Sequence, residues 1–250
     1  TYTGTTTISA GTLKIGGGGT NGSLAATAIA NAGTLAFDRS DTMTIAGVIS
    51  GAGSVTQAGN GTTILTGANT YTGTTSIAAG GTLQIGNGAS GTLGTGATTN
   101  DGSLVVNRTG ALTISSAISG GGTLTHSGAG TTSLTGANTY SGTTTVSAGT
   151  LNVGGAGTVG TLGSGAVVND ATLLIDRSDA TFTLANNISG TGALTKSAAG
   201  TNTTLVLTGA NTYSGTTTVT EGTIQVGAGG TSGSLGTGGV VTTGGTLAFN

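Results

Sequence analysis

The feature that most constrains this chain is one phrase that it writes several times. The text LTGANTYTGTTSI occupies residues 65–77, LTGANTYSGTTTV occupies 134–146 and 207–219, and TYTGTTTI opens the chain at 1–8. Its tyrosines stand at positions 2, 71, 140 and 213, so the intervals are 69, 69 and 73 residues. A long internal period indicates stacked structural units. The sequence therefore predicts units at 2–70, 71–139 and 140–212 and a partial unit at 213–250.

The short apolar words inside each unit predict β-strands. Many of them alternate apolar and polar residues, as in Thr150-Leu151-Asn152-Val153, which is the pattern of a half-buried strand. No apolar stripe has the helical spacing, and the abundant glycine and β-branched residues disfavour helix. The fold class predicted is all-β.

Composition decides between a globule and a solenoid. Aromatic residues make up 3% of the chain and charged residues 5%, while glycine supplies 53 of the 250 residues. Such a chain has too few large side chains for a sandwich core. Stacked coils bury small apolar residues against their neighbours instead, and the absence of proline preserves every ladder donor. We predict one β-solenoid over 1–250, a fragment of a longer chain, with about three coils of roughly 23 residues in each 69-residue unit.

The charge pattern excludes several classes of function. Five lysines and arginines are spread along the chain without forming a basic run, which argues against nucleic acid as a partner. No apolar segment is long enough to span a membrane, so we expect no membrane insertion of this segment. Cysteine is absent, so neither disulfides nor thiolate metal sites contribute.

The repeated phrase resembles the passenger-associated repeat of bacterial autotransporters. The order Asn-Thr-Tyr-Ser/Thr-Gly, a threonine cluster and Gly-Thr-Leu/Ile recurs at 65–86, 134–154 and 207–227, with a truncated copy at 1–16. The resemblance implies a right-handed parallel β-helix in a secreted or surface-anchored passenger, extracellular at the bacterial cell surface. It implies no catalytic residues.

Paired carboxylates are the first candidate for chemistry. Asp38 and Asp41 flank one arginine, and Asp176 and Asp179 flank another, whereas the middle unit reads Asn107-Arg108-Thr109-Gly110. Two carboxylates on a β-helix could serve a glycosidase or polysaccharide lyase. Because each pair brackets its own arginine, we favour a solvated, locally paired turn.

Other polar positions have structural interpretations as well. Asn100-Asp101 and Asn169-Asp170 fit Asx turns better than calcium sites, which need six or more oxygens. His126 is equivalent to Gln57 and Lys196, and such variety predicts an outward-facing position. The tyrosines are expected at turns with their hydroxyls in water. The threonine clusters return only once in each unit, which is poorly suited to a regular ice-binding array.

These observations predict a non-catalytic rod or stalk segment of a bacterial adhesin or fibre. We expect no enzyme activity, no cofactor, and no catalytic, cofactor-binding or metal-binding residue. The expected partners are neighbouring repeats of the same chain, with lateral self-association and host or surface glycans as open classes. The alternatives are a carbohydrate-active enzyme on a β-helix and a β-solenoid that binds glycans or ice.

Overall fold

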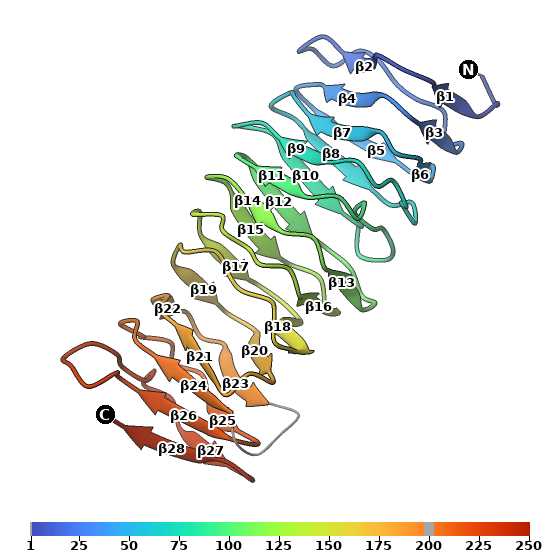
Figure 1. The fold of residues 1–250 in the computed structure, drawn as a ribbon. Helices are drawn as coiled ribbons and strands as arrows, with labels where there is room; N and C mark the ends of the chain where they lie inside the picture. Colours follow the sequence, from blue (N-terminus) through green and yellow to red (C-terminus); the bar gives the residue numbers. More distant parts are fainter. Residues whose placement is uncertain (1, 198–202) are drawn as a thin grey trace.

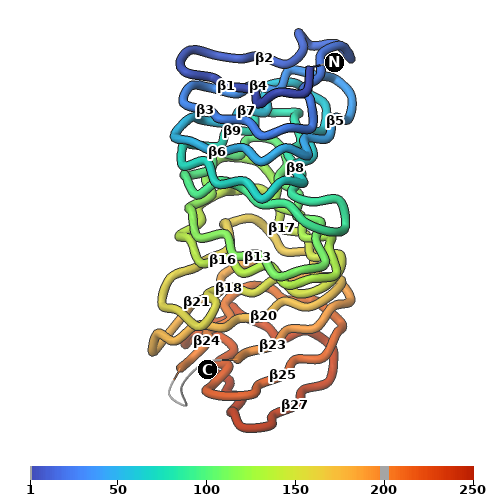
Figure 2. The backbone as a smooth tube through the Cα atoms, turned by 90° about the vertical axis from the view of Figure 1, so that its right-hand side faces the viewer, coloured from blue at the N-terminus to red at the C-terminus, as the bar shows by residue number. Residues whose placement is uncertain are grey.

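The predicted all-β solenoid is confirmed by the computed structural model, which describes residues 2–197 and 203–250. Over these residues the chain winds into a rod of parallel strands, with its two ends at opposite ends of the rod (Figure 1). The tube in Figure 2 shows the stacked turns from the side. The described residues contain no helix, hence none that is long and apolar enough to cross a membrane.

Within the described residues, each complete unit contributes eight strands. The strands of the first unit are β1 (Thr6–Ile8), β2 (Thr12–Gly16), β3 (Ile29–Asn31), β4 (Thr34–Asp38), β5 (Thr42–Ile45), β6 (Ile49–Ser50), β7 (Ser54–Gln57) and β8 (Thr62–Leu65). Those of the second are β9 (Thr75–Ile77), β10 (Thr82–Ile85), β11 (Thr98–Asn100), β12 (Ser103–Val106), β13 (Leu112–Ile114), β14 (Ile118–Ser119), β15 (Thr123–His126) and β16 (Thr131–Leu134).

The third unit repeats the same order, and the partial fourth unit begins it again. The third unit contains β17 (Thr144–Val146), β18 (Thr150–Gly157), β19 (Val167–Asn169), β20 (Thr172–Arg177), β21 (Thr181–Leu184), β22 (Ile188–Ser189), β23 (Ala193–Ser197) and β24 (Thr204–Leu207). The fourth contains β25 (Thr217–Val219), β26 (Thr223–Val226), β27 (Val240–Thr242) and β28 (Thr246–Phe249).

Each strand pairs in parallel with strands one turn away along the rod. Paired residues lie between 19 positions apart, as for Thr131 and Thr150, and 23 apart, as for Thr6 and Ile29. The chain thus turns three corners, and its strands form three faces. One face carries the sheets β1-β3-β6 and β13-β16-β18-β20-β23-β25-β27. The second carries β2-β4-β7-β9-β11-β14 and β21-β24-β26-β28. The third carries β5-β8-β10-β12-β15-β17-β19-β22.

Strands that are equivalent in successive units lie on different faces. The second strands of the successive units are β2, β10, β18 and β26, and each belongs to a different sheet. A unit holds eight strands and two irregular segments, one at the boundary with the preceding unit (69–72) and one inside (92–95 in the second unit). Both segments also stack on the turn before. Ten segments on three faces make three and a third turns. The prediction of about three coils per unit is confirmed, and the extra third rotates each unit by one face.

The core is a column of inward-facing side chains. The strands alternate buried and half-exposed residues, so that Thr63 and Leu65 of β8 point inward while Thr62 and Ile64 point outward. Aliphatic side chains stack along the inside of the three faces, and burying each one contributes about 1.5–3 kcal/mol. No turn encloses this core alone, because its inward side chains are covered by the turns on either side.

Outward threonines form more regular rows than the sequence predicts. The first residues of β5, β8, β10, β12 and β15 are in register on five successive turns, and they are Thr42, Thr62, Thr82, Ser103 and Thr123. This row is not apparent in the sequence, because its five residues do not occupy equivalent positions in the repeat units. The row is one residue wide: the neighbouring outward column reads Thr44, Ile64, Gln84, Val105 and Thr125.

Candidate functional site

Three of the four tyrosines lie inside the solenoid, whereas Tyr2 is 48% exposed. Tyr71, Tyr140 and Tyr213 are 0% exposed, so the expectation that their hydroxyls reach water is wrong for these three. The Tyr71 hydroxyl shares a hydrogen bond of 2.8 Å with Thr75, and burial raises the pKa of the phenol. The Cδ2–Cε2 edge of the ring lies next to Gly94 of the next turn, where an added Cβ atom would come within 2.3 Å of Cε2. Each of these three tyrosines therefore fills the core at a point where irregular backbone replaces the strand ladder; we call this side chain the tyrosine plug.

An asparagine beside each tyrosine links three turns. The Asn69 side chain accepts a hydrogen bond from the Ile49 amide at 2.8 Å and donates to the Thr92 carbonyl at 2.7 Å. Asn138 and Asn211 make the same pair of contacts in their own units. These asparagines join the irregular segments to the turns on both sides.

The position of His126 faces inward. Gln57, His126 and Lys196 are each 1% exposed, which overturns the prediction of an outward-facing position. His126 Nε2 donates to the Gly130 carbonyl at 3.2 Å, while Nδ1 accepts from the Thr132 hydroxyl at 3.2 Å. Burial lowers the pKa of His126, and it also lowers that of Lys196. Each of the three residues satisfies polar groups at the equivalent corner of its own unit, which explains why different polar side chains serve there.

Three arginines hold the glycine-rich loops that leave the rod. Arg39, Arg108 and Arg177 donate through Nη1 to the carbonyls of Gly22, Gly91 and Gly160 respectively, on the preceding turn. In Figure 2 the loop at 86–91 and the loop at 154–160 project from opposite sides of the rod. In the sequence, the 69-residue spacing of the arginines indicates that they occupy equivalent positions in their units. It does not indicate that each one binds a glycine carbonyl.

Two of the arginines also grip a carboxylate. Arg39 donates to both oxygens of Asp41 at 2.8 and 2.7 Å, and the hydrogen bonds hold the pKa of Asp41 below its usual value. Arg177 binds Asp179 in the same way, at 2.9 Å for both contacts. Asp38 instead pairs with Lys14 at 2.8 Å. The predicted local pairing therefore applies to Asp41 and Asp179, but Asp38 pairs across turns.

The middle unit leaves the same arginine without its carboxylate. Gly110 occupies the position of Asp41 and Asp179, and Arg108 Nε is buried with no hydrogen-bond partner among the described residues. A Cβ atom built on Gly110 would lie 3.7 Å from Arg108 Nη2, which is an ordinary contact distance. The missing side chain thus leaves this edge of the guanidinium buried without the carboxylate that its equivalents bind.

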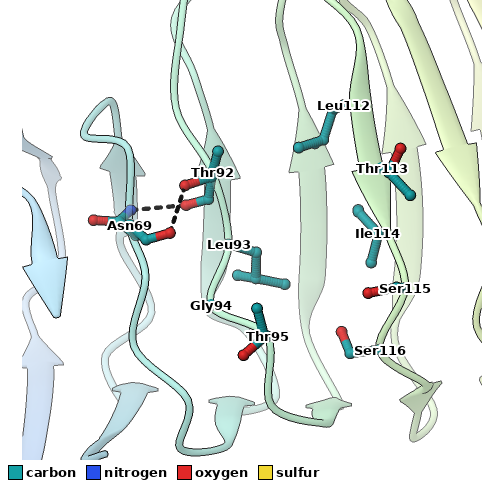
Figure 3. A pocket seen from close by; sticks show the side chains of 10 residues that line it. All are labelled: Asn69, Thr92, Leu93, Gly94, Thr95, Leu112, Thr113, Ile114, Ser115 and Ser116. Carbon is teal, nitrogen blue, oxygen red and sulfur yellow. Dashed lines mark hydrogen bonds between the residues drawn. The ribbon is translucent and has the colours of Figure 1, made fainter. Parts of the chain in front are cut away.

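A hollow of about 210 Å³ lies beside this corner. Its walls are the irregular segment 92–95 and residues 112–116, and no hydrogen bond between described residues joins these two segments. Leu93, Leu112 and Ile114 supply an apolar surface (Figure 3). Polar groups surround it, namely Asn69, Thr92, Thr95, Thr113, Ser115 and Ser116.

The third unit closes the equivalent gap with its own side chain. Asn186 occupies the position of Ser116, and its Nδ2 donates to the carbonyls of Gly163 at 2.8 Å and Gly165 at 2.6 Å. The shorter Ser116 makes no such contact with Gly94 or Gly96 in the second unit. The hollow is therefore bounded by backbone acceptors that a longer donor reaches elsewhere in the same molecule.

The predicted Asx corners hydrogen-bond between turns. Asp101 accepts from the Gly121 amide at 3.0 Å, and Asp170 accepts from the Thr191 amide at 3.0 Å. The buried Asn100 donates to the Thr123 carbonyl of the next turn. Within the described residues, no three side chains of histidine, aspartate or glutamate gather into a group that would hold a metal ion.

Comparison with known proteins places the repeated segments. The family model described as passenger-associated-transport-repeat matches residues 1–15, 55–85, 124–153 and 194–226. These matches include the buried polar position and the tyrosine, but not Arg108 or residues 92–95 and 112–116. No solved structure matches the chain.

One curated relative has a similar stretch. The adhesin BmaC autotransporter of Brucella suis biovar 1 (strain 1330) is 55% identical over 53 residues, which are 21% of this chain. The match covers 2% of that adhesin's length. Together with the family matches, it confirms the resemblance carried by the repeated phrase. The chain contains four copies of the autotransporter passenger-associated repeat, the first of them partial.

Proposed function

We propose that this chain is a non-catalytic rod segment of a bacterial surface adhesin, with its location outside the cell. The observation that supports this role is the stacking of parallel strands from one end of the described rod to the other, in which each inner turn is covered by its neighbours. A solenoid of this kind extends in proportion to its number of turns. The adhesin relative supports the surface setting.

The rotation of each unit makes a specific test of this role. Deletion of residues 71–139 joins Thr70 to Tyr140 and preserves the phrase Ala-Asn-Thr-Tyr-Ser-Gly. We expect a folded rod that is shorter by three and a third turns, about 16 Å at ~4.8 Å per turn. Small-angle X-ray scattering measures the length, and circular dichroism measures the β-content.

A deletion out of phase with the turns is the control. Removal of residues 103–112 takes away about half a turn and brings unlike strands into register. We expect that variant to lose much of its β-signal and to unfold at a lower denaturant concentration. Equal stability of the two deletion variants would contradict the modular rod.

A further inference from the structure

We propose that Asn21 is the preferred Asn-Gly site of spontaneous deamidation in this chain, where the asparagine converts to aspartate and isoaspartate. This inference goes beyond the rod function and does not depend on it. The chain contains three Asn-Gly pairs, at 21–22, 60–61 and 87–88. All three asparagines are exposed, so exposure does not distinguish them. The hydrogen bonds of the glycine amides do.

The reaction needs the asparagine side chain, the amide that follows it, and water. The backbone nitrogen of Gly22, after losing its proton to a base in solution, attacks Cγ of Asn21. A bond forms between this nitrogen and Cγ, the Cγ–Nδ2 bond breaks, and ammonia leaves. Water then opens the resulting succinimide ring at either carbonyl, which gives aspartate or isoaspartate. The attack therefore requires a glycine amide that is free to lose its proton and to reach the side chain.

The structure holds two of the three glycine amides in hydrogen bonds between turns. The Gly61 amide donates to the Arg39 carbonyl at 2.8 Å, and the Gly88 amide donates to the Asn107 carbonyl at 2.9 Å. Each amide must give up this bond before its nitrogen can attack, so a local opening of the turn has to precede the reaction. The asparagines that precede these two glycines are protected for this reason.

The Gly22 amide lies outside the contacts between turns. No hydrogen bond between described residues holds it, and both Asn21 and Gly22 are exposed. The bond equivalent to that of Gly88 is made in this unit by Gly18, whose amide donates to the Asp38 carbonyl at 2.8 Å. The pair at 21–22 thus follows the anchored part of its loop, with an unbonded amide next to an exposed side chain.

The contact that holds this loop leaves the reacting peptide group free. Arg39 Nη1 donates to the Gly22 carbonyl, which belongs to the peptide group after Gly22. The attacking nitrogen belongs to the peptide group before it. Isoaspartate directs the backbone through Cβ of residue 21 and so inserts one methylene directly before Gly22. We expect this insertion to displace the carbonyl from Arg39 and to loosen the loop at 16–22.

Peptide mapping of the intact 250-residue chain tests the site. The folded chain is incubated in mildly alkaline buffer and then digested with trypsin, which places Asn21 in peptide 15–39 and the other two pairs in peptide 40–108. Mass spectrometry detects each new carboxyl group, and fragment ions assign it to a residue. We expect Asn21 to react about fivefold faster than Asn60 and Asn87, the factor that one retained hydrogen bond gives. Its products should include both aspartate and isoaspartate.

Unfolding the chain is the matched control. Urea at a concentration that unfolds the chain removes the hydrogen bonds of Gly61 and Gly88, so all three asparagines should then react at similar rates. Asn21→Gln should abolish the reaction at position 21, because the longer side chain would have to form a six-membered ring. It should leave the rates at Asn60 and Asn87 unchanged, and circular dichroism checks its fold.

Four results would overturn the proposal. Equal or faster reaction at Asn60 or Asn87 in the folded chain would show that the hydrogen bonds do not protect them. A rate order that persists in urea would assign the preference to flanking residues. Reaction of Asn21 in urea but not in the folded chain would show that the loop restrains it. Aspartate without isoaspartate would reject the succinimide route. None of these results alters the length measurement that tests the rod.

Discussion

The corners after β12 and β20 have the same backbone plan but differ in how they are completed. In the third unit Arg177 grips Asp179 and Asn186 bridges the gap beyond it. In the second unit glycine and serine leave both positions unfilled. The structural elements common to both, the tyrosine plug and the asparagine link, are complete in each. The comparison shows that the tyrosine and asparagine contacts are common to both units, whereas the residues that complete the arginine corner and the gap differ between them.

The largest effect is expected where the two units are alike. Gly94→Ala and Gly163→Ala place a methyl group 2.1 to 2.6 Å from atoms of Tyr71 and Tyr140. Such overpacking should cost about 3 kcal/mol in each unit, and it should lower the urea midpoint of unfolding. Gly17→Ala is the control, since its added Cβ meets nothing within 4 Å. A normal midpoint for Gly94→Ala would show that the tyrosine plug does not hold the turns together.

Exchanging the residues at positions 116 and 186 should open the gap in the third unit and close it in the second. Asn186→Ser removes two hydrogen bonds and should cost about 1–2 kcal/mol, while Ser116→Asn should stabilise the chain by about 0.5–1 kcal/mol. Amide hydrogen exchange of residues 92–95 and 161–164 locates the changes. If both substitutions destabilise, the second gap differs in shape from the third.

Completion of the arginine corner should have a smaller effect. Gly110→Asp gives Arg108 the pair that Arg177 has, and should raise stability by about 0.5–1 kcal/mol because the pair is bidentate but partly exposed. Urea unfolding at low and high salt measures the gain, which salt should reduce. Gly110→Asn is the uncharged control. A gain of equal size from asparagine would show that charge is unimportant at this corner.

The smallest expected effect is the pH dependence at the buried polar position. Because burial lowers the pKa of His126, the unfolded chain takes up a proton at a higher pH than the folded chain. Stability should therefore be greatest above pH ~6.5, the ordinary histidine pKa, and should fall as the pH drops toward the folded pKa. His126→Gln copies the first unit and should flatten the urea midpoint between pH 5 and pH 8. An unchanged slope would assign the titration to other groups.

Local pattern was sufficient for the strands and insufficient for the side-chain environments. Alternation at 150–153 predicted a strand, and β18 begins there. The prediction failed for His126 because a polar side chain was expected to face water, although alternation in β15 puts it on the inward face with Leu124. It failed for the tyrosines because they lie in irregular segments, where no alternation marks which way they face. His126 does occupy a position equivalent to those of Gln57 and Lys196. The variety of polar side chains at this position does not mean exposure, because each one satisfies the polar groups of a buried corner in a different way. The incomplete corner at Arg108 was visible only as the substitution of Gly110 for aspartate.

The sequence alone determined the strands, the 69-residue period and the family resemblance, since each is a property of neighbouring residues or of their recurrence. Only the tertiary structure showed the extra third of a turn that each unit makes beyond the three predicted. The turn length depends on how the irregular segments stack on the turn before, and a third of a turn per unit brings residues far apart in sequence into one row. The same stacking places Arg108 beside the hollow, because contacts between turns set their separation.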